Sequence, residues 1–410
     1  MSFPSCLFAS LFACPFGSQA LWFFPALLVL LLVLLFLLRW IDWVAARRVM
    51  AAPTADAAEL PRISIIVPCF NAARALETSI PQMLQQDYPD FQIILVNENS
   101  EDDTADVIKR LAQSDPRVRH TYVPDTSRSI EPRKLALTLG IKAARSEWVV
   151  IADPDAQPVS RSWLRTLAAR CTETADTVLS LCLVRENDDE PRAALRRASY
   201  ECLAEQLRLA AAARCGNPIG WLPANVCMRK SWFLANDGFT DSLTLPFGEE
   251  TLLLAAHATR ERTAVCLDRA AALTLPAPSR RALAMEHVKA CETGRRAGRR
   301  ARLYRLRETA AAWTHFLALL VPVVYLALRL AVDLFQNAYT AAALAPDIIV
   351  FLLAAALLLL PPLFLRPVFK RLQQPVPWLY ATAHALLFPW RRTAAAVRCK
   401  WLRKTFVRKF

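Results

Sequence analysis

The feature that most constrains this chain is an apolar stretch near its N-terminus, Ala20 to Leu38, followed closely by Arg39, Arg47 and Arg48. An apolar helix of about 20 residues crosses the hydrocarbon core of a bilayer, and basic residues accumulate at the cytoplasmic end of such a helix. We therefore expect a membrane anchor with its N-terminus outside and the following residues in the cytosol. A cleaved signal peptide is the alternative, but the first twenty residues carry no basic residue.

Two further apolar segments lie near the C-terminus, Ala310 to Val332 and Ile348 to Leu365. The connection between them contains Asp333 and Asp347 but no Lys or Arg, so we expect it outside. Basic residues lie on the other side of both segments: Arg299, Arg300, Arg302, Arg305, Arg307, Arg366, Lys370 and Arg371. Three crossings are therefore consistent with one orientation, that of a multi-pass membrane protein whose soluble domain lies in the cytoplasm. Because the first segment contains His315 and Arg329, buried core helices are the alternative.

These segments divide the 410 residues into four predicted parts. We expect an anchor and linker over 1–60, a soluble domain over 61–300, two membrane helices over 301–366 and a cytoplasmic tail over 367–410. The net charge is +14, and in the tail bases alternate with apolar residues from Arg391 to Lys409. Such a tail is typical of a helix that lies on anionic lipid. Nucleic-acid binding is the other explanation of the charge, but its clustering beside apolar segments favours lipid.

The cysteines, histidines and glycines exclude several kinds of site. Eleven cysteines contain no CxxC pair, and the five histidines have no ligand spacing, so neither a zinc site nor a disulfide framework is predicted. Only eight glycines are present, and none forms a phosphate-binding loop of the P-loop or dinucleotide type.

The soluble domain alternates strand and helix patterns. We predict strands over 62–67, 91–96, 118–123 and 148–152, with helices from Asn71, over 102–112 and over 131–144, and a long amphipathic helix over 192–213. This order indicates βαβ units and a parallel sheet, in which ligands bind beyond the carboxyl ends of the strands.

Acidic residues collect at these strand ends. Asn97 and Glu98 end the second strand, and Asp153 and Asp155 follow the fourth on either side of Pro154. Residues two apart project to the same side of an extended strand, and paired carboxylates suit Mg²⁺ or Mn²⁺ shared with substrate phosphates. An acidic turn that is merely solvated is the alternative.

Five segments resemble family 2 glycosyltransferases in order and spacing, over about Arg62 to Ala258. They are SIIVPCFNA (Ser64–Ala72), VNENSEDDT (Val96–Thr104), RKLALTLGIKAARSEWVVIADPDAQP (Arg133–Pro158), NVCMRKSWF (Asn225–Phe233) with Gly238 and Phe239, and FGEET (Phe247–Thr251). The resemblance implies a bacterial-type protein with an α/β GT-A fold, a Rossmann-like domain for nucleotide-diphospho-sugars, here with transmembrane helices at both ends. It also implies transfer of a sugar from a UDP- or GDP-linked donor with inversion at the anomeric carbon.

The resemblance assigns roles to donor-side residues. Pro68 and Glu98 are expected at the nucleotide, with Asn97 replacing the first acid of the family's DD motif. Asp155 is expected to bind Mg²⁺ or Mn²⁺, with Asp153 beside it at the ribose or the waters of the metal. Lys134, next to Arg133, is expected to help hold the donor, and a solvated helix start is the alternative for both.

The acceptor side is assigned in the same way. Glu249 and Glu250 match the family's ED motif, in which the second acid is the general base for the acceptor hydroxyl; Glu250 stands where Asp is usual. An acid that only stabilises the start of a helix is the alternative. Trp221 is a candidate for stacking on a sugar, although aromatic residues in this setting are more often core residues. Arg295 and Arg296 stand where processive members carry QxxRW, so either they contact diphosphate or lipid headgroups or they are simply cytoplasmic charges.

The predicted function is a non-processive transfer to a lipid-linked or envelope glycan acceptor, in contact with membrane lipids and without nucleic acid. Two other classes stay open at this point. A nucleotidyltransferase shares the fold and the acidic site, although the Gly-rich basic loop that it needs after the first strand is missing from Pro68 to Ala73. A weakly active or inactive scaffold of the same fold is the other, because Asn97 and Glu250 depart from the motifs.

Overall fold

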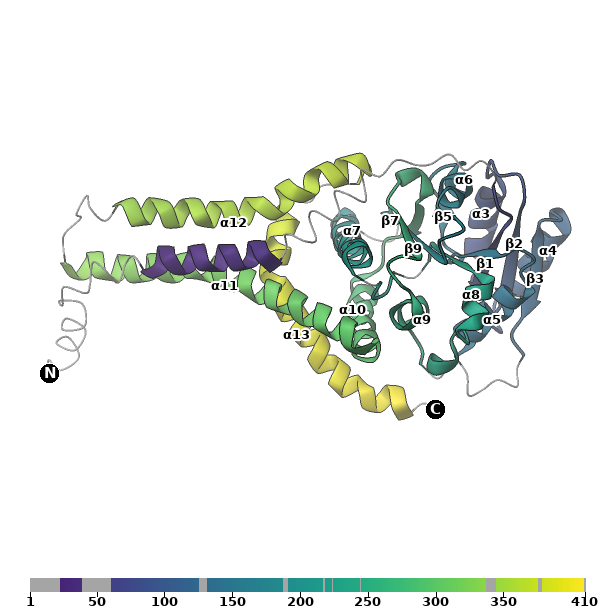
Figure 1. Ribbon diagram of the computed structural model, residues 1–410. Helices are drawn as coiled ribbons and strands as arrows, with labels where there is room; N and C mark the ends of the chain where they lie inside the picture. Colours follow the sequence, from purple (N-terminus) through teal and green to yellow (C-terminus); the bar gives the residue numbers. More distant parts are fainter. Residues whose placement is uncertain are drawn as a thin grey trace. The chain divides into compact units, whose positions relative to one another are not determined.

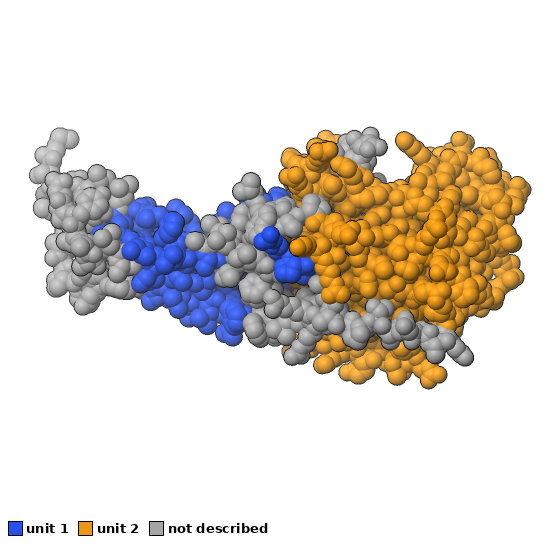
Figure 2. All heavy atoms as spheres, turned by 90° about the horizontal axis from the view of Figure 1, so that it is seen from above, with its two compact units in different colours: residues 1–40, 305–368, 377–393 blue, residues 41–304, 369–376, 394–410 orange. Residues whose placement is uncertain are grey.

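The computed structural model describes residues 23–38, 60–124, 131–186, 191–216, 218–222, 224–243, 245–336, 344–374 and 378–408. The chain forms two compact units, coloured separately in Figure 2. Unit 1 contains residues 1–40, 305–368 and 377–393, and unit 2 contains residues 41–304, 369–376 and 394–410. The predicted strands and all candidate site residues belong to unit 2.

Unit 2 is built around a seven-stranded sheet of order β3-β2-β1-β4-β8-β6-β9, beside a three-stranded sheet of order β5-β10-β7 (Figure 1). The strands are β1 (Ile63–Cys69), β2 (Phe91–Asn97), β3 (Val118–Tyr122), β4 (Trp148–Ile151), β5 (Gln157–Pro158), β6 (Thr177–Ser180), β7 (Cys182–Arg185), β8 (Val226–Arg229), β9 (Thr263–Cys266) and β10 (Leu273–Pro276).

The helices between these strands match the predicted alternation. They are α3 (Ala73–Leu84), α4 (Thr104–Ser114), α5 (Pro132–Ala143), α6 (Trp163–Ala168), α7 (Arg192–Cys215), α8 (Lys230–Ala235), α9 (Glu249–His257) and α10 (Arg280–Arg296), followed by α11 (Gly298–Gln336), α12 (Leu344–Arg371) and α13 (Trp378–Arg408). Two short 3₁₀ turns are also present, η1 (Thr240–Ser242) and η2 (Arg269–Ala271).

The predicted parallel sheet is confirmed for β1 to β4 and needs one correction. β1 pairs in parallel with both β2 and β4, and β2 pairs in parallel with β3. β8, however, runs antiparallel to both β4 and β6. The sheet is therefore mixed, because β8 enters it from the acceptor half of the chain without a crossover helix of the βαβ kind.

Helices cover both faces of the parallel strands, which explains why every residue of β1 is buried. On one face, Ile65 and Leu95 belong to a core that also includes Leu76 of α3 and Trp163 of α6. On the other face lies α5, where a Cβ added at Gly140 would come within 2.5 Å of the Ile66 side chain. Glycine at this position thus allows α5 to pack closely on the sheet, which fixes the start of α5 beyond the strand ends.

Unit 1 consists of apolar helices. Leu28 and Leu35 of the N-terminal helix, Phe23–Leu38, form one buried cluster with Ala311, Ala318 and Leu319 of α11. Arg329 of α11 forms an ion pair, with its Nε 3.7 Å from Asp347 Oδ2. The Tyr325 hydroxyl also donates a hydrogen bond to the Asp347 carboxylate. Arg329 and Asp347 are thus paired, as ionisable groups in apolar helices usually are.

Among the described residues, one helix is long and apolar enough to cross a membrane, Gly298–Arg329. Phe23–Leu38 is apolar but shorter, and residues 20–22 of the predicted anchor lie outside the described part. The predicted segment Ile348 to Leu365 falls within α12, part of whose side chains are not described. The three crossings, the domain boundaries and the lipid-bound tail remain predictions.

Candidate functional site

The candidate site lies at the carboxyl edge of the central strands. β1 lies between β2 and β4. The strand order therefore runs outward from β1 in both directions, which makes β1 the switch point of the sheet. Ligands of open α/β sheets bind in the crevice at such a switch point. Glu98 directly follows β2, and Asp153 and Asp155 follow β4. The fold therefore brings the predicted donor-side acids to the ends of the two strands that flank β1.

Arg133, in the first turn of α5, is a cation at this edge. Its Nη2 donates to Asp153 Oδ1 at 2.5 Å, and both side chains are about a quarter exposed. Burial lowers the pKa of Arg133, but the carboxylates of Asp153, Glu250 and Glu249 outweigh this and raise the pKa above its usual range. The guanidinium therefore stays charged between acids of the donor half and acids of the acceptor half.

Glu250 is the second residue of α9 and is 1% exposed. Within the described part of the chain, its Oε1 has no hydrogen-bond partner. Burial, followed by the charge of Glu249, raises the pKa of Glu250 to about 7. A carboxylate whose pKa lies near the working pH is suited to accept a proton. The structure thus gives Glu250 the properties that a general base needs.

Glu98 is also buried, at 8% exposure. Burial raises its pKa to about 7, with Arg133 opposing this shift and Glu131, Glu249 and Asp153 adding to it. The preceding Asn97 has its amide oxygen engaged by Ser100, which donates through Oγ at 2.8 Å and through its backbone N–H at 3.1 Å. Because a backbone N–H can only donate, this contact fixes the amide orientation, and the Nδ2 group points away from Ser100.

The Asp155 side chain suits a metal shared with a substrate. It is exposed, and no hydrogen bond or ion pair from the described residues engages its carboxylate; Arg185 Nη1 donates instead to the Asp155 backbone carbonyl at 2.8 Å. No group of three His, Cys, Asp or Glu side chains within the described ranges makes a complete metal cage. Mg²⁺ commonly takes only one or two carboxylates and completes its shell with phosphate oxygens and waters. Asp155 fits that requirement, with Asp153 held beside it by Arg133.

Lys134 does not lie where a donor ligand would. Its side chain is fully buried, and Nζ donates to the carbonyl oxygens of Ser242, Leu245 and Phe247 at 2.6, 2.7 and 3.1 Å. An ammonium group has three protons, so none is left for a phosphate. The expectation that Lys134 binds the donor is therefore wrong, as is the alternative of a solvated helix start.

Trp221 lies in the core, and this excludes it as a candidate for stacking on a sugar. It is 1% exposed, and its indole N–H donates to the Ser180 carbonyl at 2.8 Å, so neither face is available to stack on a sugar. Trp221 is instead a core residue, whose carbonyl accepts a hydrogen bond from Thr251 Oγ1 of α9 at 2.7 Å. The burial of Trp221 could not be read from the sequence, because it depends on a contact with Ser180, the last residue of β6.

The remaining predicted residues lie around this edge. Pro68 is buried near the end of β1, opposite Val96 of β2. Arg295 and Arg296 are exposed in the last turn of α10, where Arg296 Nε pairs with Glu292 Oε1 at 3.0 Å. The charge of Arg296 contributes to lowering the pKa of Lys134 after burial. The end of α10 is therefore close to the candidate site.

Phe70 is a residue that sequence reasoning passed over. It directly follows β1 and is 57% exposed, next to Asn71, whose φ of 46° turns the chain. Asn71 Oδ1 accepts from the Glu101 backbone N–H at 2.9 Å, which joins this turn to the loop after β2. An aromatic side chain directly after a strand end was the available signal, because apolar residues there are normally covered.

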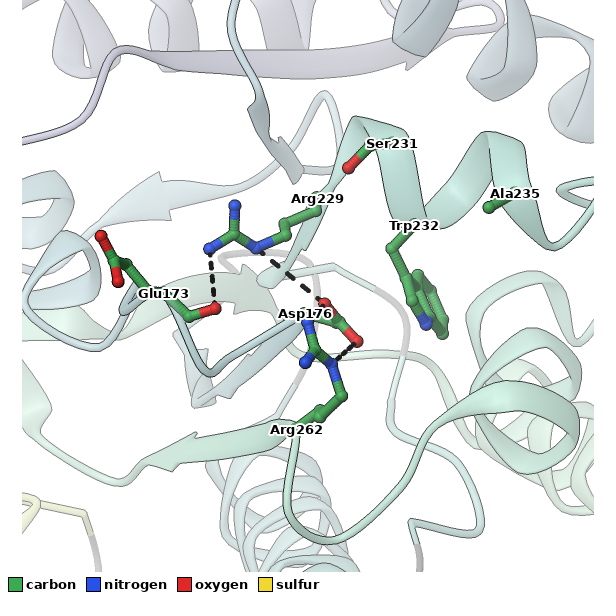
Figure 3. Close-up of a pocket in the computed structure, with 7 residues that line it drawn as sticks. All are labelled: Glu173, Asp176, Arg229, Ser231, Trp232, Ala235 and Arg262. Atoms are coloured by element: carbon green, nitrogen blue, oxygen red, sulfur yellow. Dashed lines mark hydrogen bonds and ion pairs between the residues drawn. The ribbon is translucent and has the colours of Figure 1, made fainter.

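A separate hollow of about 560 Å³ lies at the opposite edge of the sheet (Figure 3). There Asp176, just before β6, binds Arg262 through both carboxylate oxygens and lies 3.9 Å from Arg229 Nε at the end of β8. Arg229 also covers the Trp148 ring at 4.7 Å. These contacts join the ends of three strands, and none of the predicted site residues lines the hollow.

Part of this chain is similar to known proteins. Residues 64–230 match the profile of Glycosyl transferase family 2. These residues form a family 2 glycosyltransferase domain. The family match includes Glu98, Arg133, Asp153 and Asp155 but ends before Glu249 and Glu250, so the acceptor-side assignment depends on the structure and the motif.

Two curated relatives are glycosyltransferases and match only part of this chain. The GalNAc(5)-diNAcBac-PP-undecaprenol beta-1,3-glucosyltransferase of Campylobacter jejuni is 31% identical over 127 residues, which are 31% of this chain and 40% of the relative. Glycosyltransferase GlyG of Streptococcus pneumoniae is 29% identical over 118 residues, 28% of this chain and 38% of the relative. The similarity thus spans about two fifths of the length of each relative.

The fold also has a solved counterpart. The mannosyltransferase PcManGT from Pyrobaculum calidifontis, solved in complex with GDP-Man and Mn²⁺, superimposes with a TM-score of 0.50 and 20% sequence identity, covering 89% of this chain and 99% of that one. At this identity the likeness supports the fold only. Together with the family match, it confirms the predicted GT-A fold.

Proposed function

We propose that this chain is a membrane-bound, metal-assisted, inverting and non-processive glycosyltransferase. It would move a sugar from a nucleotide-diphosphate donor to a lipid-linked or envelope glycan acceptor. One observation carries the proposal: the Arg133 guanidinium is paired with Asp153 beside the metal-ligand candidate, and it also interacts with Glu250, whose Oε1 is buried without a partner in the described structure. A base and a leaving-group site thus lie around one fixed cation.

The reaction follows from these positions. Glu250 accepts the proton of the acceptor hydroxyl as that oxygen bonds to the anomeric carbon, and the bond from this carbon to the diphosphate oxygen breaks. Arg133 stabilises the negative charge that develops on the diphosphate. Attack on the face opposite the leaving group inverts the anomeric centre. Mg²⁺ or Mn²⁺ held by Asp155 supplies further positive charge to the diphosphate when bound.

The relatives support the substrate classes without fixing them. The Campylobacter jejuni enzyme is named for an undecaprenol diphosphate-linked substrate, and the archaeal mannosyltransferase was solved with GDP-Man and Mn²⁺. A lipid-linked acceptor also agrees with the apolar helix Gly298–Arg329. We therefore place the protein at the cytoplasmic face of the inner membrane, with either UDP or GDP as the nucleotide of the donor.

Two residues of the donor side complete the proposal. Phe70 offers an exposed aromatic face on which the nucleobase stacks. Burial raises the pKa of Glu98 to about 7, so this side chain is partly protonated at neutral pH and can either donate to or accept from the nucleoside.

Arg295 and Arg296, exposed at the end of α10, face the acceptor diphosphate or lipid headgroups.

Calorimetric titration of the detergent-purified protein with UDP and with GDP, with and without Mn²⁺, tests the donor site. We expect one nucleotide to bind in a Mn²⁺-dependent manner, and the Asp155→Ala variant to lose this dependence. Asp106→Ala is the matched control, because Asp106 is an exposed acid on α4 paired only with Lys109 in the described structure. Failure of the folded wild type to bind either nucleotide under any metal condition would contradict the proposal.

A further inference from the structure

Lys134 has a set of contacts that the proposed reaction does not use. Its Nζ reaches three carbonyl oxygens within one short loop, those of Ser242, Leu245 and Phe247. A buried lysine is uncommon in proteins because removal of an ammonium from water is costly. An apolar side chain would fill the same space, so the three hydrogen bonds point to a more specific role.

The loop leads directly to the candidate base. Phe247 is followed by Gly248 with φ of 78°, and α9 begins at Glu249. The same loop is also tied to the start of α5 through the backbone, because the Glu131 N–H donates to the Leu243 carbonyl at 2.9 Å. The N-terminal turn of α5 therefore holds the segment that places Glu250.

Charge strengthens this connection. Burial lowers the pKa of Lys134 to about 8, while Glu249, Glu131 and Glu250 act in the opposite direction. The side chain is thus mainly protonated at neutral pH and keeps the protons for its three acceptors. Its charge also favours the ionised form of the neighbouring carboxylates.

The adjacent Arg133 gives the contrast. Successive residues of a helix point about 100° apart, and Arg133 turns to Asp153 while Lys134 turns to the loop before α9. We infer that Lys134 is a positioning residue: it holds the backbone at Ser242, Leu245 and Phe247 to the start of α5 and thereby fixes Glu250 for proton transfer. This inference rests on the proposed function only in the role that it gives Glu250.

The test compares Lys134→Met with Arg133→Met in the full-length protein. We expect Lys134→Met to keep the nucleotide affinity of the wild type within about twofold, but to reduce kcat for nucleoside diphosphate release on the order of 100-fold, as displacement of a catalytic group does. Arg133→Met should instead weaken nucleotide binding at least tenfold. UDP, GDP and Mn²⁺ are the binding probes, and UDP-glucose, UDP-N-acetylglucosamine and GDP-mannose with a bacterial lipid extract are the reaction probes.

Two further readouts do not depend on a known acceptor. Hydrogen exchange of the amides over 242–252 should be faster in Lys134→Met than in the wild type, while exchange over 150–158 should not change. The acidic limb of the rate profile should move to higher pH, since loss of a positive charge raises the pKa of Glu250, whose other charged neighbours Glu249, Arg133 and Asp153 are unchanged. Lys134→Gln keeps an amide donor, so its exchange rates over 242–252 should fall between those of the wild type and of Lys134→Met. If Lys134→Met does not fold, Lys134→Gln takes its place in these measurements.

Two results would overturn the inference. Loss of nucleotide affinity in Lys134→Met equal to that in Arg133→Met would make Lys134 a donor ligand after all. Unchanged exchange over 242–252 in the folded variants would show that Lys134 does not hold the loop. A wild type that binds no nucleotide contradicts the proposed function instead, and the exchange experiment still decides the role of Lys134.

Discussion

Glu250 makes a prediction at the scale of a single residue, the pH dependence of transfer. Its pKa is raised to about 7 by burial and then by Glu249, and only the ionised form accepts a proton. Below that pH the rate constant kcat/KM should fall about tenfold per pH unit, and above it the value should level off. Steady-state rates from pH 5 to 9 measure this. A profile that is flat from pH 5.5 to 8 would show that no group with this pKa acts in the reaction.

Phe70 makes a second prediction at this scale. Stacking of a base on an aromatic ring contributes roughly 1–3 kcal/mol, so Phe70→Ala should weaken nucleotide binding by about 5- to 150-fold, with Mn²⁺ dependence retained. Calorimetry with UDP and GDP measures the change. The control is Trp401→Ala, which removes an aromatic that is 85% exposed in α13, outside the sheet. Equal affinities for Phe70→Ala and wild type would remove Phe70 from the nucleotide site.

At this scale the sequence identified the acids better than the cations and aromatics. Asp153 and Asp155 were predictable because they follow a short apolar run that is a strand in any reading. The role of Lys134 was not, because its partners are more than 100 residues away in the chain. The sequence left both stacking and core open for Trp221, since its burial depends on the distant Ser180.

At the scale of elements, the start of α9 depends on Gly248. Its φ of 78° suits glycine, and a Cβ there would come within 2.8 Å of Thr293 Cγ2 in α10. Gly298 is a matched control, because its φ of 82° carries the same backbone strain but a Cβ would meet nothing within 4 Å. We expect Gly248→Ala to lower kcat at least tenfold more than Gly298→Ala, with nucleotide affinity unchanged in both. Equal losses of kcat would mean that the contact between α9 and α10 does not position Glu250.

The elements themselves could largely be predicted from the sequence. The strands β1 to β4 lie within two residues of the predicted ranges, because periodic apolar runs bounded by Pro, Asn and Asp have few other solutions. The four-residue strands β6 and β8 gave no such pattern, and the antiparallel pairing of β8 with β4 joins distant parts of the chain. Local patterns do not specify such pairings, and this left the sheet incorrectly described as parallel.

At the scale of the whole molecule, we predict that the protein stays in the membrane when membranes are washed with alkaline carbonate. The helix Gly298–Arg329 is long and apolar enough to cross a bilayer, and a crossing helix is not released by alkaline carbonate. Membranes from cells that express the chain should therefore retain it after a carbonate wash and release it only with detergent. Complete recovery in the carbonate supernatant would show that the apolar helices form a soluble core instead.

The assignment of Glu250 as the general base is tested by comparing Glu250→Gln with Glu249→Gln. Sugar transfer is measured with a donor whose nucleotide binds to the wild type. We predict that Glu250→Gln binds the nucleotide with the affinity of the wild type. Its kcat should be at least 100-fold lower, because an amide cannot accept the hydroxyl proton. Glu249→Gln should lose far less, since the proposed role of Glu249 is to raise the pKa of Glu250 and includes no proton transfer. Transfer by Glu250→Gln at more than a tenth of the wild-type rate would contradict the assignment of Glu250 as the base.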